Sequence, residues 1–259
     1  MATLPRELIL SIFEDLKCHP TALKTCALVC RDWTTPSQAH IFHTIILDID
    51  IKCLALHNLL LSSPHIAPLI RDLSVITEDD VPEVILDEEA SLAAAILLLN
   101  KVQSLTLHMG WRMHWHKLSL DLRNAIIKLL KLSSLTDLTM GNWFFDFSDI
   151  DLHNIFRHAV ALKRLTLTGP SCPTSWTPCD DAFLEGLPGQ RTCLEELKLG
   201  LEYGTFGIGE WFCRPLCALD LRRLRSLHVM YTGDNALVSQ LLDVIGESLE
   251  RLHFEVEAC

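Results

Sequence analysis

The sequence predicts an α/β protein in which a small N-terminal helical unit is followed by repeated strands and helices. Two observations predict this class. The first 45 residues combine helix-start signals with apolar residues at helical spacing. The rest of the chain contains seven copies of the pattern apolar-x-x-Leu-x-apolar, with helical periodicity between several of them.

The N-terminal block LPRELILSIFEDL predicts the first helix. Pro5 suits the first turn because its φ is fixed and it lacks an amide hydrogen, and Glu7 lies at the positive end of the helix dipole. A second helix is predicted over residues 21–33, between Pro20 and Pro36. Such a small unit buries too little surface to be stable alone, so we expect it to pack against a neighbour or a partner. An apolar stripe follows the first helix at Leu8, Ile9, Ile12, Phe13 and Leu16.

A dozen residues of this N-terminal unit form a further pattern. They are Leu4, Pro5, Glu7, Leu8, Ile12, Leu16, Leu23, Val29, Cys30, Arg31, Trp33 and Phe42. In their order and approximate spacing, the unit resembles the F-box family. The resemblance implies a three-helix F-box-like domain over residues 1–45.

The repeat pattern has a leucine at the centre of all seven copies. Alternating apolar positions predict a short strand in each copy, and helices are predicted over residues 91–99, 122–132, 152–162 and 236–245. An earlier copy centred on Ile45 lies 28 residues before the first and joins the two regions without a linker. The central leucines are Leu73, Leu105, Leu138, Leu165, Leu197, Leu227 and Leu252, separated by 32, 33, 27, 32, 30 and 25 residues.

One strand plus one helix in about 25–33 residues resembles an irregular leucine-rich repeat, in which each unit buries its apolar face against the next. The resemblance implies a solenoid of about seven repeats over residues 46–259. The Asn or Cys that usually follows the strand in this family is absent, and His108 and Thr168 begin the corresponding segments. The chain ends at Cys259, shortly after the last copy, so we expect either a protected edge strand or a longer natural chain.

Composition and charge narrow the environment and the partners. The longest apolar run, residues 92–99, is too short to span a membrane, and no signal segment precedes Leu4. We therefore expect a protein of the cytoplasm, the nucleus or both, without membrane contact. The net charge is -11, and seven carboxylates lie between residues 78 and 89, which argues against nucleic acid binding. This acidic run is interpreted as a solvated loop, with a docking site for a basic partner as the alternative.

Catalytic and metal-binding motifs are not found in the sequence. No phosphate-binding glycine loop, nucleophile elbow or paired-histidine metalloprotease motif is present. The ten cysteines include no Cys-x-x-Cys pair, which favours buried free thiols. His114 and His116 flank Trp115 and are interpreted as surface residues and not as metal ligands. The sequence therefore predicts a protein that is not an enzyme and has no metal or cofactor.

Large aromatic residues follow the repeat strands and are the candidates for binding a protein substrate. The alternative is that they fill the core between irregular repeats. The substrate-binding candidates are Trp111, Trp115, Trp143, Phe145, Trp176, Tyr203, Trp211 and Tyr231. Period-two alternation places a second set on the concave face of the sheet, namely Ser74, Thr106, Thr139, Thr166, Lys198, His228 and His253.

The two resemblances together imply a substrate-recognition adaptor of a Skp-cullin-F-box ubiquitin ligase. The N-terminal helices would bind a Skp-type adaptor and through it a cullin, while the repeats hold an unknown protein substrate close to the ubiquitin-transferring enzyme. The alternative is a non-catalytic leucine-rich-repeat scaffold whose F-box-like cap is purely structural. Exposure of the apolar face of the first helices would favour the ligase adaptor. The residues expected at the Skp interface, or supporting it, are Leu4, Pro5, Leu8, Ile9, Ile12, Leu16, Val29 and Trp33.

Overall fold

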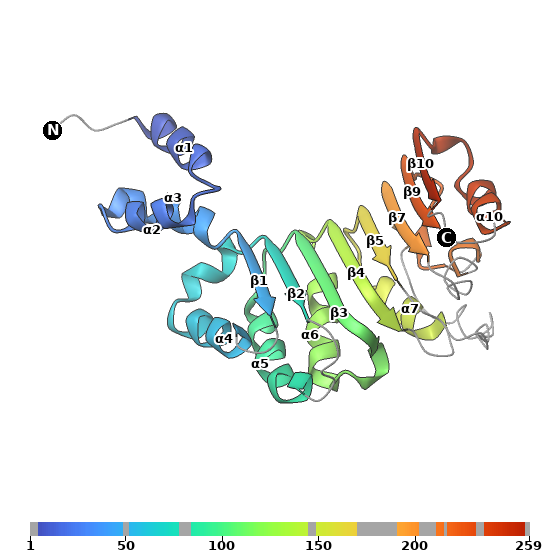
Figure 1. The fold of residues 1–259 in the computed structure, drawn as a ribbon, viewed down its shortest axis with the longest axis horizontal. Coiled ribbons are helices and arrows are strands. Elements are labelled where there is room, and N and C mark those ends of the chain that lie inside the picture. The colour runs from blue at the N-terminus through green and yellow to red at the C-terminus, as the bar shows by residue number, and fades with distance from the viewer. Residues whose placement is uncertain are drawn as a thin grey trace.

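Three N-terminal helices lead into a parallel sheet that has helices along one of its faces (Figure 1). The structure is a computed structural model and describes residues 5–48, 52–77, 84–144, 149–169, 191–201, 211–214, 217–231 and 236–256. Within these ranges, no helix is both long enough and apolar enough to cross a membrane. The predicted mixed α/β class with a helical N-terminal unit is confirmed.

The N-terminal unit contains α1 (Arg6–Asp15), α2 (Pro20–Ala27) and α3 (Arg31–Ile41). The prediction of one helix over residues 21–33 is wrong, because Cys30 is extended, with φ of -162° and ψ of 166°, and caps the start of α3. Pro36 lies inside α3 and not at a helix end as predicted. The hydroxyl of Thr34 lies 2.9 Å from the carbonyl oxygen of Ala27 and links α3 to the end of α2.

Eight parallel strands form the main sheet in the order β1-β2-β3-β4-β5-β7-β9-β10. Neighbouring strands follow chain order, so every connection returns the chain to the same end of the sheet. Two further strands, β6 (Thr192–Cys193) and β8 (Leu219–Asp220), pair separately. The main strands are β1 (Thr44–Asp48), β2 (Asp72–Ile76), β3 (Ser104–His114), β4 (Asp137–Phe144), β5 (Arg164–Thr168), β7 (Glu196–Leu201), β9 (Ser226–Tyr231) and β10 (Arg251–Val256).

The connecting helices are α4 (Lys52–Ser62), α5 (Val84–Leu98), α6 (Leu120–Leu130), α7 (Asp149–Phe156) and α10 (Ala236–Ile245), with short 3-10 turns η1 (Pro64–Leu69), η2 (Trp115–Lys117) and η3 (Gly246–Ser248). The four predicted helices overlap α5, α6, α7 and α10 and are confirmed. Helix α4 was not predicted, because leucines occupy its exposed side as well as its buried side. Leu54 and Leu61 are exposed, whereas Leu56 and Leu60 are buried.

The acidic run of residues 78–89 reaches into α5, and one of its carboxylates does not fit the predicted solvated loop. Glu89 is buried on α5, and its Oε2 accepts a hydrogen bond of 2.8 Å from the backbone amide of Ser119. Ser119 in turn caps α6 by accepting the amide of Leu122 at 3.2 Å. Glu89 therefore connects two neighbouring helices. The remaining acidic side chains of the run lie outside the described part of the chain.

The central residues of the repeat pattern face one another across the whole main sheet. The register pairs Ile45 with Leu73 at one edge and Leu227 with Leu252 at the other. The intervening strands continue the same alignment without interruption. From Leu73 to Leu227, these leucines are buried, because alternate side chains of a strand point to the same face. The predicted strand is therefore confirmed in every copy, including the early one at Ile45.

A repeated backbone hydrogen-bond pattern fixes this register. The carbonyl oxygen of Thr136, for example, accepts the amides of Lys163 and Arg164 at 2.8 and 2.9 Å. Each such carbonyl lies immediately before a strand and accepts two amides at the start of the next strand in the sheet. This ladder aligns the strands without the Asn side chains that the sequence lacks. The accepting residues are His43, Arg71, Gln103, Thr136, Lys163, Glu195 and Arg225.

Leu197→Ala is expected to lower the free energy of unfolding by about 2–5 kcal/mol, because it leaves a cavity in the core. The matched control is Leu252→Ala, which changes the same register position in edge strand β10, where the leucine is 50% exposed. The loss at Leu252 should be less than half as large. Urea denaturation followed by circular dichroism measures both, and equal losses would contradict the assigned core.

Stability should also depend on pH through Asp220. The Arg222 guanidinium, which donates hydrogen bonds of 2.8 and 2.9 Å, lowers the pKa of Asp220 from 3.8 to about 2. Since the pKa is lower in the folded state, the ionised carboxylate stabilises the fold above about pH 4. The advantage of the wild type over Asp220→Asn should shrink as the pH falls from about 4 to about 2. Unfolding free energies measured across this range test it, and a constant difference would refute it.

Candidate functional site

The three N-terminal helices extend beyond strand β1, and the sheet does not cover their outer side (Figure 1). Helices α1 and α2 both pack on α3, and α3 contacts η1, the turn that leads into β2. The unit thus leans on the rest of the chain through α3, as its small size predicts.

Aromatic packing holds the helices of this unit together. Phe13 of α1 is fully buried and meets Trp33 of α3 edge to face, with ring centroids 5.7 Å apart and an interplanar angle of 82°. The same ring stacks on His40, at 6.4 Å and 19°. Leu23 supplies the buried residue of α2. Trp33 therefore supports the surface of the unit from beneath.

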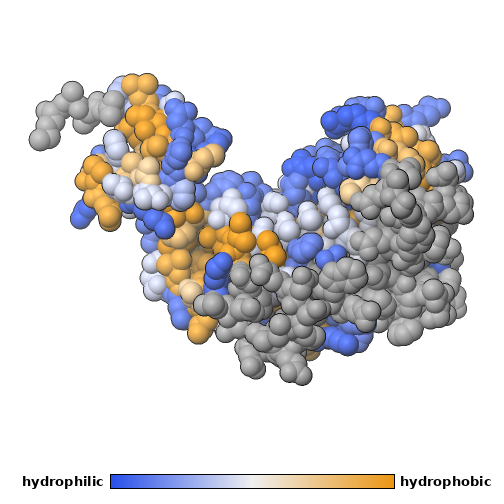
Figure 2. All heavy atoms as spheres, viewed as in Figure 1, coloured by the Kyte–Doolittle hydropathy of each residue, from blue (hydrophilic) through white to orange (hydrophobic). Residues whose placement is uncertain are grey.

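Several apolar side chains of the unit remain exposed. The largest exposures are at the turn between α2 and α3, where Leu28 is 87% and Val29 is 62% exposed. Leu8 and Ile12, one helical turn apart on α1, are 52% and 37% exposed, and Leu10 is 48% exposed. Figure 2 shows hydrophobic residues gathered over these helices. These five residues lie in two places, on α1 and at the turn between α2 and α3, and we call them together the N-terminal apolar surface. Exposed apolar residues in this number on so small a unit are typical of a binding surface.

The structure describes seven of the eight residues predicted for the Skp interface, and Leu4 lies outside the described residues. Pro5, Leu8, Ile12 and Val29 are exposed, whereas Ile9, Leu16 and Trp33 are partly buried. Leu10 and Leu28 were not predicted at this interface. The sequence pattern predicted a continuous helix through Leu28, but α2 ends at Ala27, so no further turn of helix covers this side chain. The available signal was the apolar pair Leu28-Val29 directly before the N-cap Cys30.

Three of the predicted substrate-binding aromatic residues are buried. Trp143 donates a hydrogen bond of 3.0 Å from Nε1 to the carbonyl of Leu107, and its ring lies 5.8 Å from that of Trp115. Trp211 packs on Phe156, with ring centroids 5.5 Å apart. The expectation of an exposed aromatic rim is therefore wrong at Trp115, Trp143 and Trp211, and the alternative of core filling holds there. Strands β3 and β4 continue past the repeat pattern, and Trp115 and Trp143, which lie near their ends, belong to the core cluster.

The side chains of the other five candidates are outside the described part of the structure. Phe145, Trp176 and Tyr203 lie outside the described residues, as do the side chains of Trp111 and Tyr231. Substrate binding at these five positions stays a prediction.

The predicted concave-face residues lie side by side on the face of the sheet that the helices leave free, called here the open face. The register aligns Thr139 with Thr166, Lys198 with His228, and His228 with His253. Figure 1 shows the helices α4 to α7 on the other face. The predicted strand alternation is confirmed.

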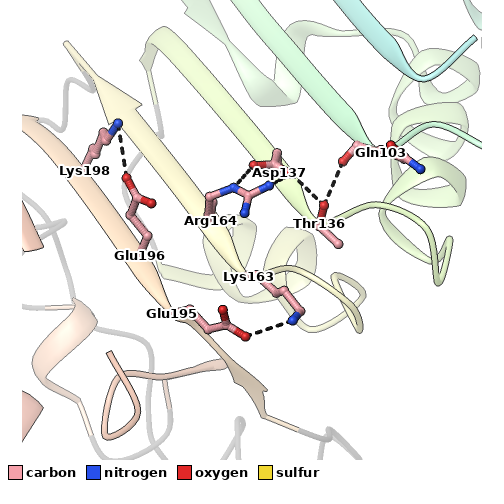
Figure 3. Close-up of polar contacts among 8 residues, drawn as sticks. All are labelled: Gln103, Thr136, Asp137, Lys163, Arg164, Glu195, Glu196 and Lys198. Carbon is pink, nitrogen blue, oxygen red and sulfur yellow. Dashed lines mark hydrogen bonds and ion pairs between the residues drawn. The ribbon is translucent and has the colours of Figure 1, made fainter. Parts of the chain in front are cut away.

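Charged side chains on and beside this face pair with one another (Figure 3). Arg164 of β5 binds Asp137 of β4, with Nη2 2.6 Å from Oδ2. Lys198 lies 3.2 Å from Glu196 on the same strand, and Lys163 lies 2.9 Å from a carboxylate oxygen of the next repeat, on Glu195. Such exposed pairs contribute little to stability. Because positive and negative side chains are paired, this part of the open face has neither a strong positive nor a strong negative electrostatic potential.

Comparison with known protein families finds a match for the N-terminal unit. A model of the F-box-like family matches residues 1–47. Residues 1–47 form an F-box-like domain. The match covers α1, α2 and α3 and reaches into β1. The F-box-like domain therefore includes residues of the first strand of the main sheet, and it indicates a role in protein-protein interaction. The comparison with curated proteins finds no match.

Phe13→Ala is expected to unfold the F-box-like domain locally, because the buried ring joins α1 to α3 and truncation of a core Phe costs about 3–5 kcal/mol. Hydrogen exchange measured by mass spectrometry should show faster exchange in α1 and α3, with strands β2 to β5 unchanged. The control Leu28→Ala removes an exposed side chain and should exchange like the wild type. Unchanged protection of α1 in Phe13→Ala would contradict the assigned packing.

Proposed function

We propose that this chain is a substrate-recognition adaptor of a Skp-cullin-F-box ubiquitin ligase and has no catalytic activity of its own. The F-box-like domain binds a Skp-type adaptor, and through it a cullin, while the remainder of the chain binds a protein substrate. The observation that carries this proposal is the N-terminal apolar surface, since F-box domains typically bind such adaptors.

The N-terminal apolar surface has the properties of an interface centre. Burial of an exposed leucine contributes up to about 3 kcal/mol, so Leu28 and Leu8 are expected to be anchors of the bound adaptor. The aromatic contact of Phe13 with Trp33 fixes the helices beneath this surface. Because that packing exists in the free chain, binding needs little ordering of the domain.

The same exposure separates the proposal from its alternative. A purely structural cap would bury the apolar sides of its helices against the sheet, but Leu8, Ile12 and Val29 are open to solvent. The described contact between the cap and the remainder of the chain runs through α3 and η1. The N-terminal apolar surface is therefore free to take part in binding another protein.

We further propose that residues 46–259 form an irregular leucine-rich-repeat solenoid. Three features support it: the strands follow chain order, all central residues share one register, and α4 to α7 lie on one face of the sheet. Such a solenoid holds its substrate at a set distance from the adaptor and raises the effective concentration of substrate lysines near the transferring enzyme. The candidate substrate contacts are Trp111, Phe145, Trp176, Tyr203 and Tyr231.

Binding of a purified Skp-type adaptor to the full chain tests this function. Leu28→Asp/Val29→Asp is expected to weaken the adaptor complex by more than about tenfold, because burial of an unpaired carboxylate is costly. The matched control is Leu61→Asp, a leucine on α4 that is 58% exposed and lies outside the F-box-like domain. Isothermal titration calorimetry supplies the dissociation constants.

Each outcome of this experiment bears on a separate part of the proposal. Tight binding by the wild type and Leu61→Asp, but not by the double variant, supports the adaptor function and the surface. If the folded wild type does not bind, the ligase function is wrong. If the double variant binds as well as the wild type, the interface lies elsewhere.

A further inference from the structure

Two histidines and a glutamate gather at the end of the open face nearest the C-terminus. His228 belongs to β9 and His253 to β10, and the parallel register pairs them directly. Their ring centroids are 4.4 Å apart, with the ring planes at 84°. Glu255 follows His253 by two residues, so its side chain points to the same face of the strand. The three side chains therefore share one small region of the sheet.

The three side chains bring atoms that can ligate a metal ion close together. Nε2 of His253 lies 2.7 Å from Oε1 of Glu255, and Nε2 of His228 lies 3.9 Å from the same oxygen. All three residues offer one ligand atom within 4.8 Å of the others. Ligands of a tetrahedral Zn²⁺ at about 2.0–2.1 Å are themselves about 3.4 Å apart. Small side-chain rotations suffice to bring these atoms to that spacing.

Among the described residues, one ligand atom has no hydrogen-bond partner. This atom is Nε2 of His228, which is buried. A buried polar atom without a partner is destabilising, so native structures rarely contain one without a reason. A metal ion bound to this nitrogen would supply the missing interaction.

The lysine that neighbours His228 on the next strand is paired with a glutamate outside this cluster. Lys198 is the register neighbour of His228 on β7, and its ammonium lies 3.2 Å from a carboxylate oxygen of Glu196. Glu196 precedes Lys198 by two residues, whereas Glu255 follows His253 by two. The lysine is therefore paired toward the start of the strands, away from Glu255.

We propose that His228, His253 and Glu255 form a binding site for a transition-metal ion of the imidazole-binding class, with Zn²⁺ as the best match. Two imidazoles and one carboxylate are ligands that zinc uses, and three protein ligands leave the fourth position open. Since His253 and Glu255 are more than half exposed, that position is accessible to water or to a side chain of a bound protein. The bound ion also joins edge strand β10 to β9.

This proposal revises the expectation that the protein binds no metal. That expectation rested on the spacing of cysteines and histidines that are close in the sequence, such as His114 and His116. His228 and His253 are 25 residues apart, and only the repeat register shows that they are neighbours. The signal was a histidine directly after the central leucine in two successive copies.

Titration of the full chain with ZnCl₂ in a phosphine-reduced buffer tests the site. The exposed Cys18 and Cys30 can bind zinc as well, so the comparison between variants carries the result. His253→Ala and Glu255→Gln change exposed side chains and should leave the fold intact. We expect each to weaken one zinc-binding event by about tenfold or more. The control His65→Ala, an exposed histidine of η1, should bind zinc like the wild type.

Imidazole nitrogen resonances provide a second measurement that is specific to the site. In the wild type, the resonances of both His228 and His253 should move on addition of one equivalent of zinc beyond that taken up by the cysteines. The site is refuted if these resonances do not move, or if His253→Ala binds zinc as tightly as the wild type. A loss in His253→Ala without any change in Glu255→Gln would overturn the three-ligand assignment.

Discussion

The carbonyl group before each strand accepts two amides from the next repeat, and the rest of the structure depends on this constraint. It sets every strand in the same register, so the central leucines form one continuous row in the core. A slip of one residue would exchange Leu165 with Thr166 and place the polar residue in the core. Backbone groups supply this alignment, so it tolerates spacings that vary between 25 and 33 residues.

The same register determines which side chains lie on the helix-covered face of the sheet and which lie on the open face. Because the leucines take the helix-covered face, the open face receives the alternating polar residues, and pairs such as Arg164 with Asp137 neutralise its charges. The exposed apolar residues of the F-box-like domain lie elsewhere, on helices that the sheet does not cover. The domain match ends within β1, whose Ile45 pairs with Leu73 of β2. The F-box-like domain is thus built into the edge of the sheet without a flexible linker, which suits a protein proposed to hold two partners at a set distance.

The sequence predicted what depends on local periodicity and missed what depends on packing between segments. Each strand of the main sheet could be located because alternating apolar residues and an apolar central residue act within six residues, as in Leu162 to Leu167. The break at Cys30 was missed, because apolar residues at helical spacing run through it and the extended backbone leaves no signature in that pattern. The burial of Trp115 and Trp143 depends on how two neighbouring strands continue past their repeats, and the pairing of His228 with His253 depends on register. Neither relation is visible within one segment.

On the proposed function, the F-box-like domain supplies the binding surface and the sheet serves as its rigid support. Hydrogen exchange of the full chain, compared with and without a bound Skp-type adaptor, tests this most directly. We expect slower exchange in residues 7–16 and 26–33 when the adaptor is bound, with the amides of β2 to β9 unchanged. Protection of the sheet strands with no change in the N-terminal helices would contradict it.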